Sequence, residues 1–318
     1  MLVDRTQLEA ALARVVAGVC DPRIGIHGPG SAAWQVERDG VIFLGGGRAA
    51  LLQLAHPYVA YGVHQHSKTR DDVIGRFRRT FDNVFAMSFG TLDDAVTAAR
   101  RVHNIHTRIT GMLGDDAGEF ASQRYHANDA DALLWVWATL VDTVVVVYQR
   151  IAGALSPALR DAYYRGSWTF ARLFGLADEH LPPTWDAFAA YVARMIASPA
   201  ITVTAPARSM AGFLFGGRLG AATQLVTAAL LPPSVRDQFA LPYGATERAG
   251  FAATVTAVRA LRIATPAAAW DLPAYRAAQR RLAGLPPSAW TQWLEHRLFA
   301  LAGRSAGQRS AGGARRIS

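Results

Sequence analysis

The stretch ALLWVWATLVDTVVVVY, Ala132–Tyr148, decides the fold. It is long and apolar enough to raise the question of a membrane-spanning helix. Asp142, however, lies near its middle, where a charge is costly in lipid, and no basic residues flank its N-terminal side. We therefore expect this stretch to form the central buried helix of a helical bundle, with no integral membrane span.

The rest of the chain is also expected to be helical, with one exception near the N-terminus. The segment AWQVERDGVIFLGGG, 33–47, alternates in character and contains Asp39–Gly40, a pair typical of two-residue hairpins. Glycines 45–47 lack the residues of a phosphate loop and the spacing of a dinucleotide fingerprint, so they are interpreted as a turn. The sequence predicts an all-α fold, a single helical domain with a small N-terminal β-hairpin.

Composition bounds the function. Of 318 residues, 51% are hydrophobic and 18% are charged, which predicts a sizeable core rather than general disorder. The net charge is +9, but the basic residues are scattered and form no dense block with aromatics, so nucleic-acid binding is not expected. The only cysteine, Cys20, excludes an intrachain disulfide, cysteine-rich metal sites and covalent haem attachment. The N-terminus lacks a signal peptide's apolar core, so a cytoplasmic location is expected.

Three proline-containing motifs are expected to separate consecutive helices within one domain. LPPT and two copies of LPPS begin at Leu181, Leu231 and Leu285, and each places a potential helix cap after the prolines. We expect an N-terminal helical segment at 1–27, one helical domain at 28–302, and a disordered Gly/Ser/Arg-rich tail at 303–318.

The segment TLDDAVTAARRVHNIHTRITG, 91–111, reads as an amphipathic helix that starts at a Thr91–Asp94 capping pair and ends at Gly111. At about 100° per residue, one face is apolar; it carries Ala95, Ala98, Val102, Ile105 and Ile109. His106 falls inside this stripe and His103 at its edge. We therefore expect His106 to be the buried histidine.

A buried neutral imidazole needs partners for its ring nitrogens, so His106 is either a hydrogen-bonded core histidine or a metal ligand. Zinc is disfavoured, because no H-E-x-x-H or cysteine partner lies nearby. A metal-dependent hydrolase that uses His103 and His106 lacks a third ligand. A single imidazole facing an apolar cavity is what haem iron requires on its proximal side.

A second amphipathic helix is expected in DDVIGRFRRTFDNVFAMSFG, 71–90. Its apolar face carries Val73, Phe77, Phe81 and Val84. Arg76 and Thr80, four residues apart, border that face, and Arg79 lies farther out. Arg76 and Thr80 can reach a polar ligand from an otherwise apolar wall; the alternative is that the arginines face solvent.

The order of these segments resembles a known family. The chain resembles the catalytic domain of the rubber oxygenases (latex clearing proteins). The segments that carry the resemblance are, in order, GGGRAALLQLAHPYVAYGVHQHS, RFRRTFDNVFAMSFGT, VHNIHTRITG, YHANDADALLWVWATLVDTVVVVY, YYRGSWTFARLFGL, LPPTWDAFAAYVARM and ALLPPSVRDQF. The same domain occurs in the fungal oxygenase that shortens the prenyl side chain in mycophenolic acid synthesis. The resemblance covers roughly residues 28–300 and marks 28–302 as an oxygenase-like haem domain.

The resemblance implies a globin-like helical core that holds non-covalent haem b. It makes His106 the proximal iron ligand and places Arg76 and Thr80 close to the haem, as binding and catalytic residues. Arg79, a third candidate catalytic residue, stands where latex clearing proteins have a lysine that can occupy the distal iron position. Arginine stays protonated and offers iron no lone pair, so a lysine-closed resting state is not expected here.

Two further departures concern the distal side and the central helix. The rubber enzymes have a proposed catalytic carboxylate in the helix before Arg76, but QLAHPYVAYGVHQHSKT contains no acid, which argues against rubber cleavage. His56, His64 and His66 are the titratable groups left there, and any of them could be a distal hydrogen-bond donor. His64 is the first candidate for that role, and a local structural contact is the alternative for each of the three. Trp137 replaces a histidine that is frequent in the family.

The sequence thus predicts a haem b-dependent oxygenase, an oxidoreductase that uses O2 on a small hydrophobic substrate, such as an isoprenoid or lipid with a double bond. The alternative is a non-catalytic helical protein that binds haem or a hydrophobic ligand, which the missing carboxylate favours.

Overall fold

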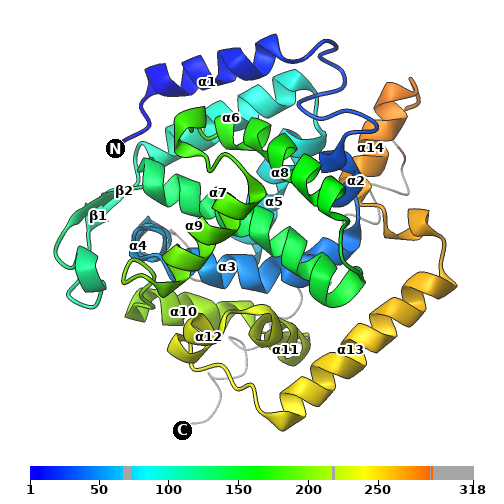
Figure 1. Ribbon diagram of the computed structural model, residues 1–318. Coiled ribbons are helices and arrows are strands. Elements are labelled where there is room, and N and C mark those ends of the chain that lie inside the picture. Colours follow the sequence, from blue (N-terminus) through cyan, green and yellow to red (C-terminus); the bar gives the residue numbers. More distant parts are fainter. Residues whose placement is uncertain (67–72, 217–218, 287, 289–318) are drawn as a thin grey trace, which may run out of the picture.

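The computed structural model describes residues 1–66, 73–216, 219–286 and 288, and gives only the backbone of 73–79 and 81. The tail expected to be disordered, 303–318, lies outside the described residues. The described part of the chain is mostly helical (Figure 1), so the predicted all-α class is confirmed. Its α-helices are α1 (Arg5–Ala17), α2 (Ala32–Glu37), α3 (Gly46–Leu54), α4 (Pro57–His66), α5 (Val73–Phe89), α6 (Leu92–His106), α7 (Ala130–Val147), α8 (Pro157–Arg172), α9 (Trp185–Ala197), α10 (Ala205–Leu214), α11 (Gly220–Leu230), α12 (Pro233–Gln238), α13 (Ala245–Ala264) and α14 (Pro273–Leu282).

Helix α7 forms the centre of the molecule, as the sequence predicts (Figure 1). It packs against α3, α8 and α9, and its side chains at Trp135 and Trp137 are fully buried. The indole nitrogens donate to the carbonyls of Leu52, at 2.8 Å, and Ser167, at 3.1 Å. Trp137 therefore connects α7 to α8.

One helical stretch of the described chain, Ala130–Ala152, is long and apolar enough to cross a membrane. Two-thirds of its most apolar window is buried inside the protein. Its one central charge, Asp142, is paired with a buried arginine rather than facing outward. These contacts favour the interpretation of α7 as a core helix.

Arg48, on α3, is the ion-pair partner of Asp142, and its hydrogen bonds connect α3 to α7 and α11. Its side chain is 4% exposed and donates to Asp142 Oδ2 at 2.6 Å and to Thr143 Oγ1 at 2.6 Å. A third bond, of 3.0 Å, reaches the carbonyl of Leu230 at the end of α11. The glycines before Arg48 allow α3 to approach its neighbours: a Cβ on Gly45 would meet Val147 of α7, and one on Gly47 would meet Thr227 of α11.

The predicted N-terminal β-hairpin is wrong. Residues 32–37 form α2, which Ser31 caps by accepting from the Trp34 backbone N–H, and 40–45 form a 3₁₀ helix, η1 (Gly40–Gly45). Asp39 starts η1 by accepting from the Val41 N–H, and its carboxylate pairs with Arg262 of α13 at 2.7 Å. Asp39 is thus a helix cap and an ion-pair partner, and tertiary contacts override the local hairpin signal.

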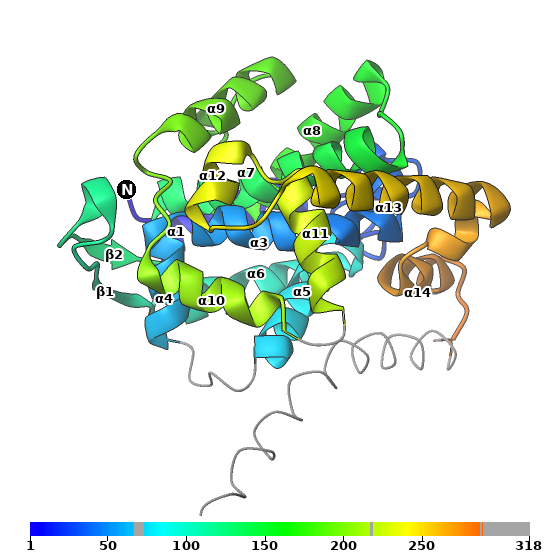
Figure 2. The same cartoon turned by 90° about the horizontal axis from the view of Figure 1, so that it is seen from below.

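The short sheet of the described chain lies elsewhere. Strand β1 (Thr110–Met112) pairs antiparallel with β2 (Arg124–His126), with Gly111 opposite Tyr125. This two-stranded sheet follows α6 in the chain and packs against α4 (Figure 2). It fixes where α6 ends, and so where the two candidate histidines lie.

Candidate functional site

Helix α6 begins where the sequence predicts and ends earlier. Thr91 Oγ1 accepts from the Asp94 N–H at 3.1 Å, and Asp94 Oδ2 accepts from the Thr91 N–H at 2.9 Å, which completes the capping box. The helix ends at His106 rather than Gly111, because the chain enters β1. Gly111 is needed for space instead: a Cβ there would meet the Tyr125 ring at 2.9 Å.

The expected burial of the two histidines is also wrong. His103 is the buried one, with 8% exposed, whereas His106 is half-buried and Ile105 is 51% exposed. The reason is that α1 covers a second side of α6: Arg100 pairs with Glu9 at 2.7 Å. The buried surface of α6 is therefore rotated toward His103, and the C-terminal end of the predicted apolar stripe is left partly uncovered.

His103 lies in a polar contact with Asn128, which follows β2. The Asn128 amide is directed at His103 Nδ1, 3.5 Å away, and donates to the His103 carbonyl and to Thr107 Oγ1, both at 3.3 Å. His103 Nε2 is buried and has no hydrogen-bond partner in the described part of the chain. Burial lowers the pKa of His103, so the neutral ring is favoured.

A small cavity of about 10 Å³ separates His103 and His106 from the end of α8. It is lined by Ala99, Val102, His103, His106, Asn128, Leu133, Leu173 and Phe174. Cofactor pockets typically measure roughly 300–1,000 Å³. The described residues on this side of His106 therefore leave no space of haem size.

The other side of α6 faces α5, which packs along it. At the N-terminal end of this contact Ala95 and Ala98 are fully buried. Toward the C-terminal end of α6, Ile105 is 51% exposed. The apolar surface next to His106 is thus less covered than the apolar surface one to two turns earlier.

The candidate residues of α5 are only partly described. The backbone of α5 places Arg76 and Thr80 one turn apart, but the side chains of Arg76 and Arg79 lie outside the described residues. The Thr80 side chain is exposed. The structure therefore places these three positions on the helix beside α6 and leaves their roles as predictions.

The three histidines of the α3–α4 region differ in their contacts. His56 is buried, and its Nδ1 caps α4 by accepting from the Tyr58 N–H at 3.3 Å; burial lowers its pKa to about 4. His66 Nε2 lies 3.0 Å from the Thr110 carbonyl. A local structural contact, the alternative for both, is confirmed. His64 is half-buried, and its buried Nδ1 has no hydrogen-bond partner among the described residues.

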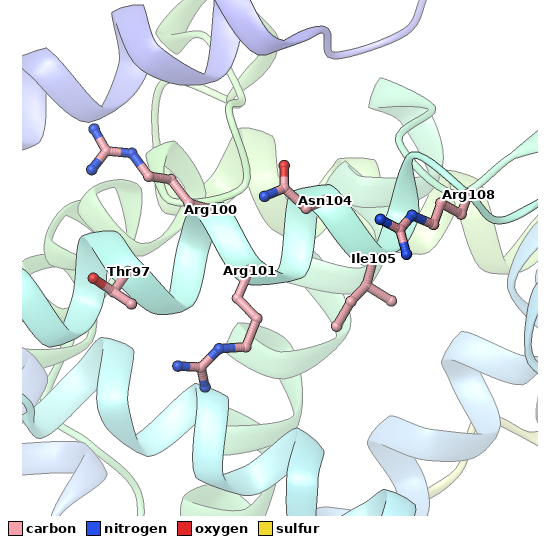
Figure 3. Close-up of a pocket in the computed structure, with 6 residues that line it drawn as sticks. All are labelled: Thr97, Arg100, Arg101, Asn104, Ile105 and Arg108. Atoms are coloured by element: carbon pink, nitrogen blue, oxygen red, sulfur yellow. The ribbon is translucent and has the colours of Figure 1, made fainter.

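An open groove of about 440 Å³ lies on the outer surface of α6 (Figure 3). Thr97, Arg100, Arg101, Asn104, Ile105 and Arg108 line it. The helical period does not predict this groove, because it assigns Ile105 to the buried apolar face, whereas Ile105 is 51% exposed beside the arginines. No group of three or more His, Cys, Asp or Glu side chains placed to hold a metal ion occurs in the described ranges.

Comparison with protein families supplies the class of the protein. Residues 34–260 match the model of the catalytic domain described as ER-bound oxygenase mpaB/B'/rubber oxygenase. This match spans more than half of the 318 residues, so the chain belongs to this family of oxygenase catalytic domains. It includes α4, α5, α6 and α7, and hence every candidate residue discussed above. Searches of curated proteins and of solved structures gave no match.

Proposed function

We propose that the protein is a haem b-dependent oxygenase that uses O2 to oxidise a small hydrophobic, unsaturated substrate of isoprenoid or lipid type, with His106 as the proximal iron ligand. The observation that carries the proposal is the family match across 34–260, which contains His106 at the partly uncovered end of α6. Haem needs only one imidazole from the protein, and the described residues offer His106 here rather than a cluster of metal ligands.

The described residues beside His106 fit haem in kind: apart from His103 and Asn128 they are apolar, and they include Val102, Leu133 and Phe174. The cavity that they line, about 10 Å³, is too small for haem, so the cofactor would lie on the side of α6 that faces α5. Apolar walls with one nitrogen ligand are the surroundings that non-covalent haem requires.

When bound, haem would supply the iron that activates O2. His106, half-buried at the end of α6, would hold the iron through a ring nitrogen. Thr80 and Arg76, one turn apart on α5, would hydrogen-bond polar groups near the reacting atoms. Arg79 stays protonated, so it would add positive charge near the site and would not bind the iron.

His64 is the proposed distal hydrogen-bond donor. Its Nδ1 is buried without a described partner, so a ring at this position can donate to or accept from a bound polar group. His56 and His66 cannot take this role without giving up their structural contacts.

The test is the absorption spectrum of the purified protein. A Soret band is expected in the wild type, lost in His106→Ala and kept in His103→Ala, the matched control three residues away on the same helix. Circular dichroism of both variants checks that α6 remains folded. The proposal fails if the protein stays colourless after haem addition, or if His103→Ala alone removes the band.

Oxygen uptake separates an oxygenase from a haem carrier. The alternative, a non-catalytic protein that binds haem or a hydrophobic ligand, is favoured by one observation: α4, the helix before Arg76, carries no acidic residue. With squalene-like and carotenoid-like substrates and an electron donor, uptake above the His106→Ala background supports the oxygenase. A red protein that consumes no oxygen across this panel supports the carrier.

A further inference from the structure

The outer groove of α6 combines positive charge with an exposed apolar side chain. Six residues line it, three of them arginines, and none of them is acidic. Figure 3 shows Arg101 and Ile105 pointing to the same side of α6, while Arg100 and Asn104 point toward α1. The groove therefore has two unlike edges.

The edge toward α1 is already neutralised. Arg100 donates to both carboxylate oxygens of Glu9, at 3.0 and 2.7 Å, and Asn104 Oδ1 accepts from Arg5 at 3.2 Å. These contacts hold the two side chains in place. They leave this edge with little capacity for a further anion.

The other edge carries two arginines whose positive charge no described residue neutralises. Arg101 and Arg108 have no hydrogen bond or ion pair with any described residue, and both are exposed. Arg101 lies on α6 and Arg108 in the turn that follows it, and both line the same groove. Two guanidinium groups that no described residue pairs produce a local positive potential that favours anions over neutral ligands.

Between the two arginines lies Ile105, 51% exposed within the groove. An isoleucine in this position loses the free energy of burial, about 25 cal/mol per Å² of apolar surface. A bare phosphate or carboxylate would satisfy the arginines and leave Ile105 in water. A neutral hydrocarbon would cover Ile105 and leave the arginines unpaired.

We propose that this groove binds one anionic amphiphile, whose phosphate or carboxylate head pairs with Arg101 or Arg108 and whose hydrocarbon chain covers Ile105. Arginine suits this role, because its planar group donates two parallel hydrogen bonds to such heads. The groove volume, about 440 Å³, fits one small ligand. This site lies on a different side of α6 from the small cavity at His106, and it does not depend on the proposed haem chemistry.

The test is calorimetric titration of the purified full-length protein with octyl phosphate below its micelle concentration. Inorganic phosphate and octanol are the comparison ligands, because each keeps only half of the proposed contacts. We expect octyl phosphate to bind about tenfold or more tightly than either, which corresponds to the loss of one charge-assisted or apolar contact. Equal affinity for octyl phosphate and phosphate would overturn the role of Ile105.

Three variants locate the site. Arg101→Gln/Arg108→Gln and Ile105→Asn should each weaken octyl phosphate binding about tenfold. The control Arg165→Gln/Arg194→Gln removes the same charge from exposed arginines of α8 and α9 and should keep wild-type affinity. If the control loses as much affinity as the groove variant, binding reflects net charge and the proposal is wrong.

Two further arms identify the source of the ligand and its independence from iron. His106→Ala should keep octyl phosphate binding; its loss there, or on addition of haem, would assign the groove to the haem site and overturn the proposal. The wild type should bind monomeric octyl phosphate. Binding seen only with phosphatidylglycerol vesicles would show a membrane-contact surface instead of a ligand groove.

Discussion

Two polar clusters in the helical core are built in opposite ways. Around Arg48, the guanidinium finds a carboxylate, a hydroxyl and a backbone carbonyl, all between 2.6 and 3.0 Å. Around His103, one ring nitrogen is directed at an amide at 3.5 Å and the other is buried without a described partner. Both residues are buried, so the difference lies in how completely their hydrogen bonds are satisfied.

Because of this difference, we expect substitutions in the two clusters to affect stability to different extents. A buried charge with a full set of partners holds helices in one arrangement, and removing one partner leaves the other uncompensated. A buried imidazole whose second nitrogen has no described partner adds little to stability. The Arg48 cluster should therefore govern folding, and the end of α6 should govern function with small effects on stability.

The largest effect is expected from Arg48→Met. This change leaves Asp142 partly buried without its charge partner, so unfolding free energy should fall by about 3 kcal/mol or more. Urea unfolding followed by circular dichroism measures the loss. The double variant Arg48→Met/Asp142→Leu should recover part of it, since both charges are then removed. A single variant as stable as the wild type would refute the structural role of this cluster.

The second largest effect is a pH dependence at Glu37, at the end of α2. Burial raises the pKa of its carboxyl to about 7, although hydrogen bonds from Ser88 and Tyr163 act in the opposite direction. The folded state thus holds the proton more tightly than the unfolded chain, whose carboxyl has a pKa of 4.5. Its contribution to stability is complete below pH 4.5 and is lost as pH rises through about 7.

Glu37→Gln should remove this dependence. The variant is expected to gain stability relative to the wild type between pH 4.5 and 7, by up to about 3 kcal/mol at the upper end. Unfolding in urea at several pH values measures the difference. His27 provides the opposite control: burial lowers its pKa to about 4, so its stabilising neutral form is lost toward acid pH. A pH-independent difference between wild type and Glu37→Gln would contradict the assignment.

The fold was predictable where local signals and burial agree. The apolar stretch Ala132–Tyr148 is α7 to within two residues at its start, and the Thr91–Asp94 cap starts α6, because each depends on residues close in sequence. The hairpin prediction failed because Asp39 takes its partner from Arg262, 223 positions away. No local pattern contains that contact.

The site was predictable only in part, for the same reason. The helical period put His106 inside the apolar stripe and His103 at its edge, but it could not show that α1 covers the flank at Arg100. That cover decides which histidine is buried. The groove at Arg101 and Ile105 also depends on tertiary packing. The roles of His106, Arg76, Thr80, Arg79 and His64 stay predictions that spectroscopy will test.

A smaller effect is expected from His103→Leu, compared with Asn128→Leu. Leucine at 103 removes a buried nitrogen that has no described partner and keeps the carbonyl that accepts from Asn128, so stability should change by less than about 1 kcal/mol. Leucine at 128 leaves two acceptors without a donor and should cost about 2 kcal/mol. Thermal unfolding of the two variants side by side measures the gap. Equal losses would mean that the His103 ring is as fully bonded as Arg48.

The smallest effect is expected from Thr91→Ala, at the far end of the same helix. The change removes the side-chain acceptor that caps the Asp94 N–H, so stability should fall by about 1 kcal/mol. Thr91→Ser keeps the hydroxyl and should keep most of that stability. Because α6 stays packed against α5 and α1, the Soret band and oxygen uptake per folded protein should match the wild type. If Thr91→Ala instead removes the band while the protein remains folded, the two ends of α6 are coupled, and the separation between its structural start and its functional end is wrong.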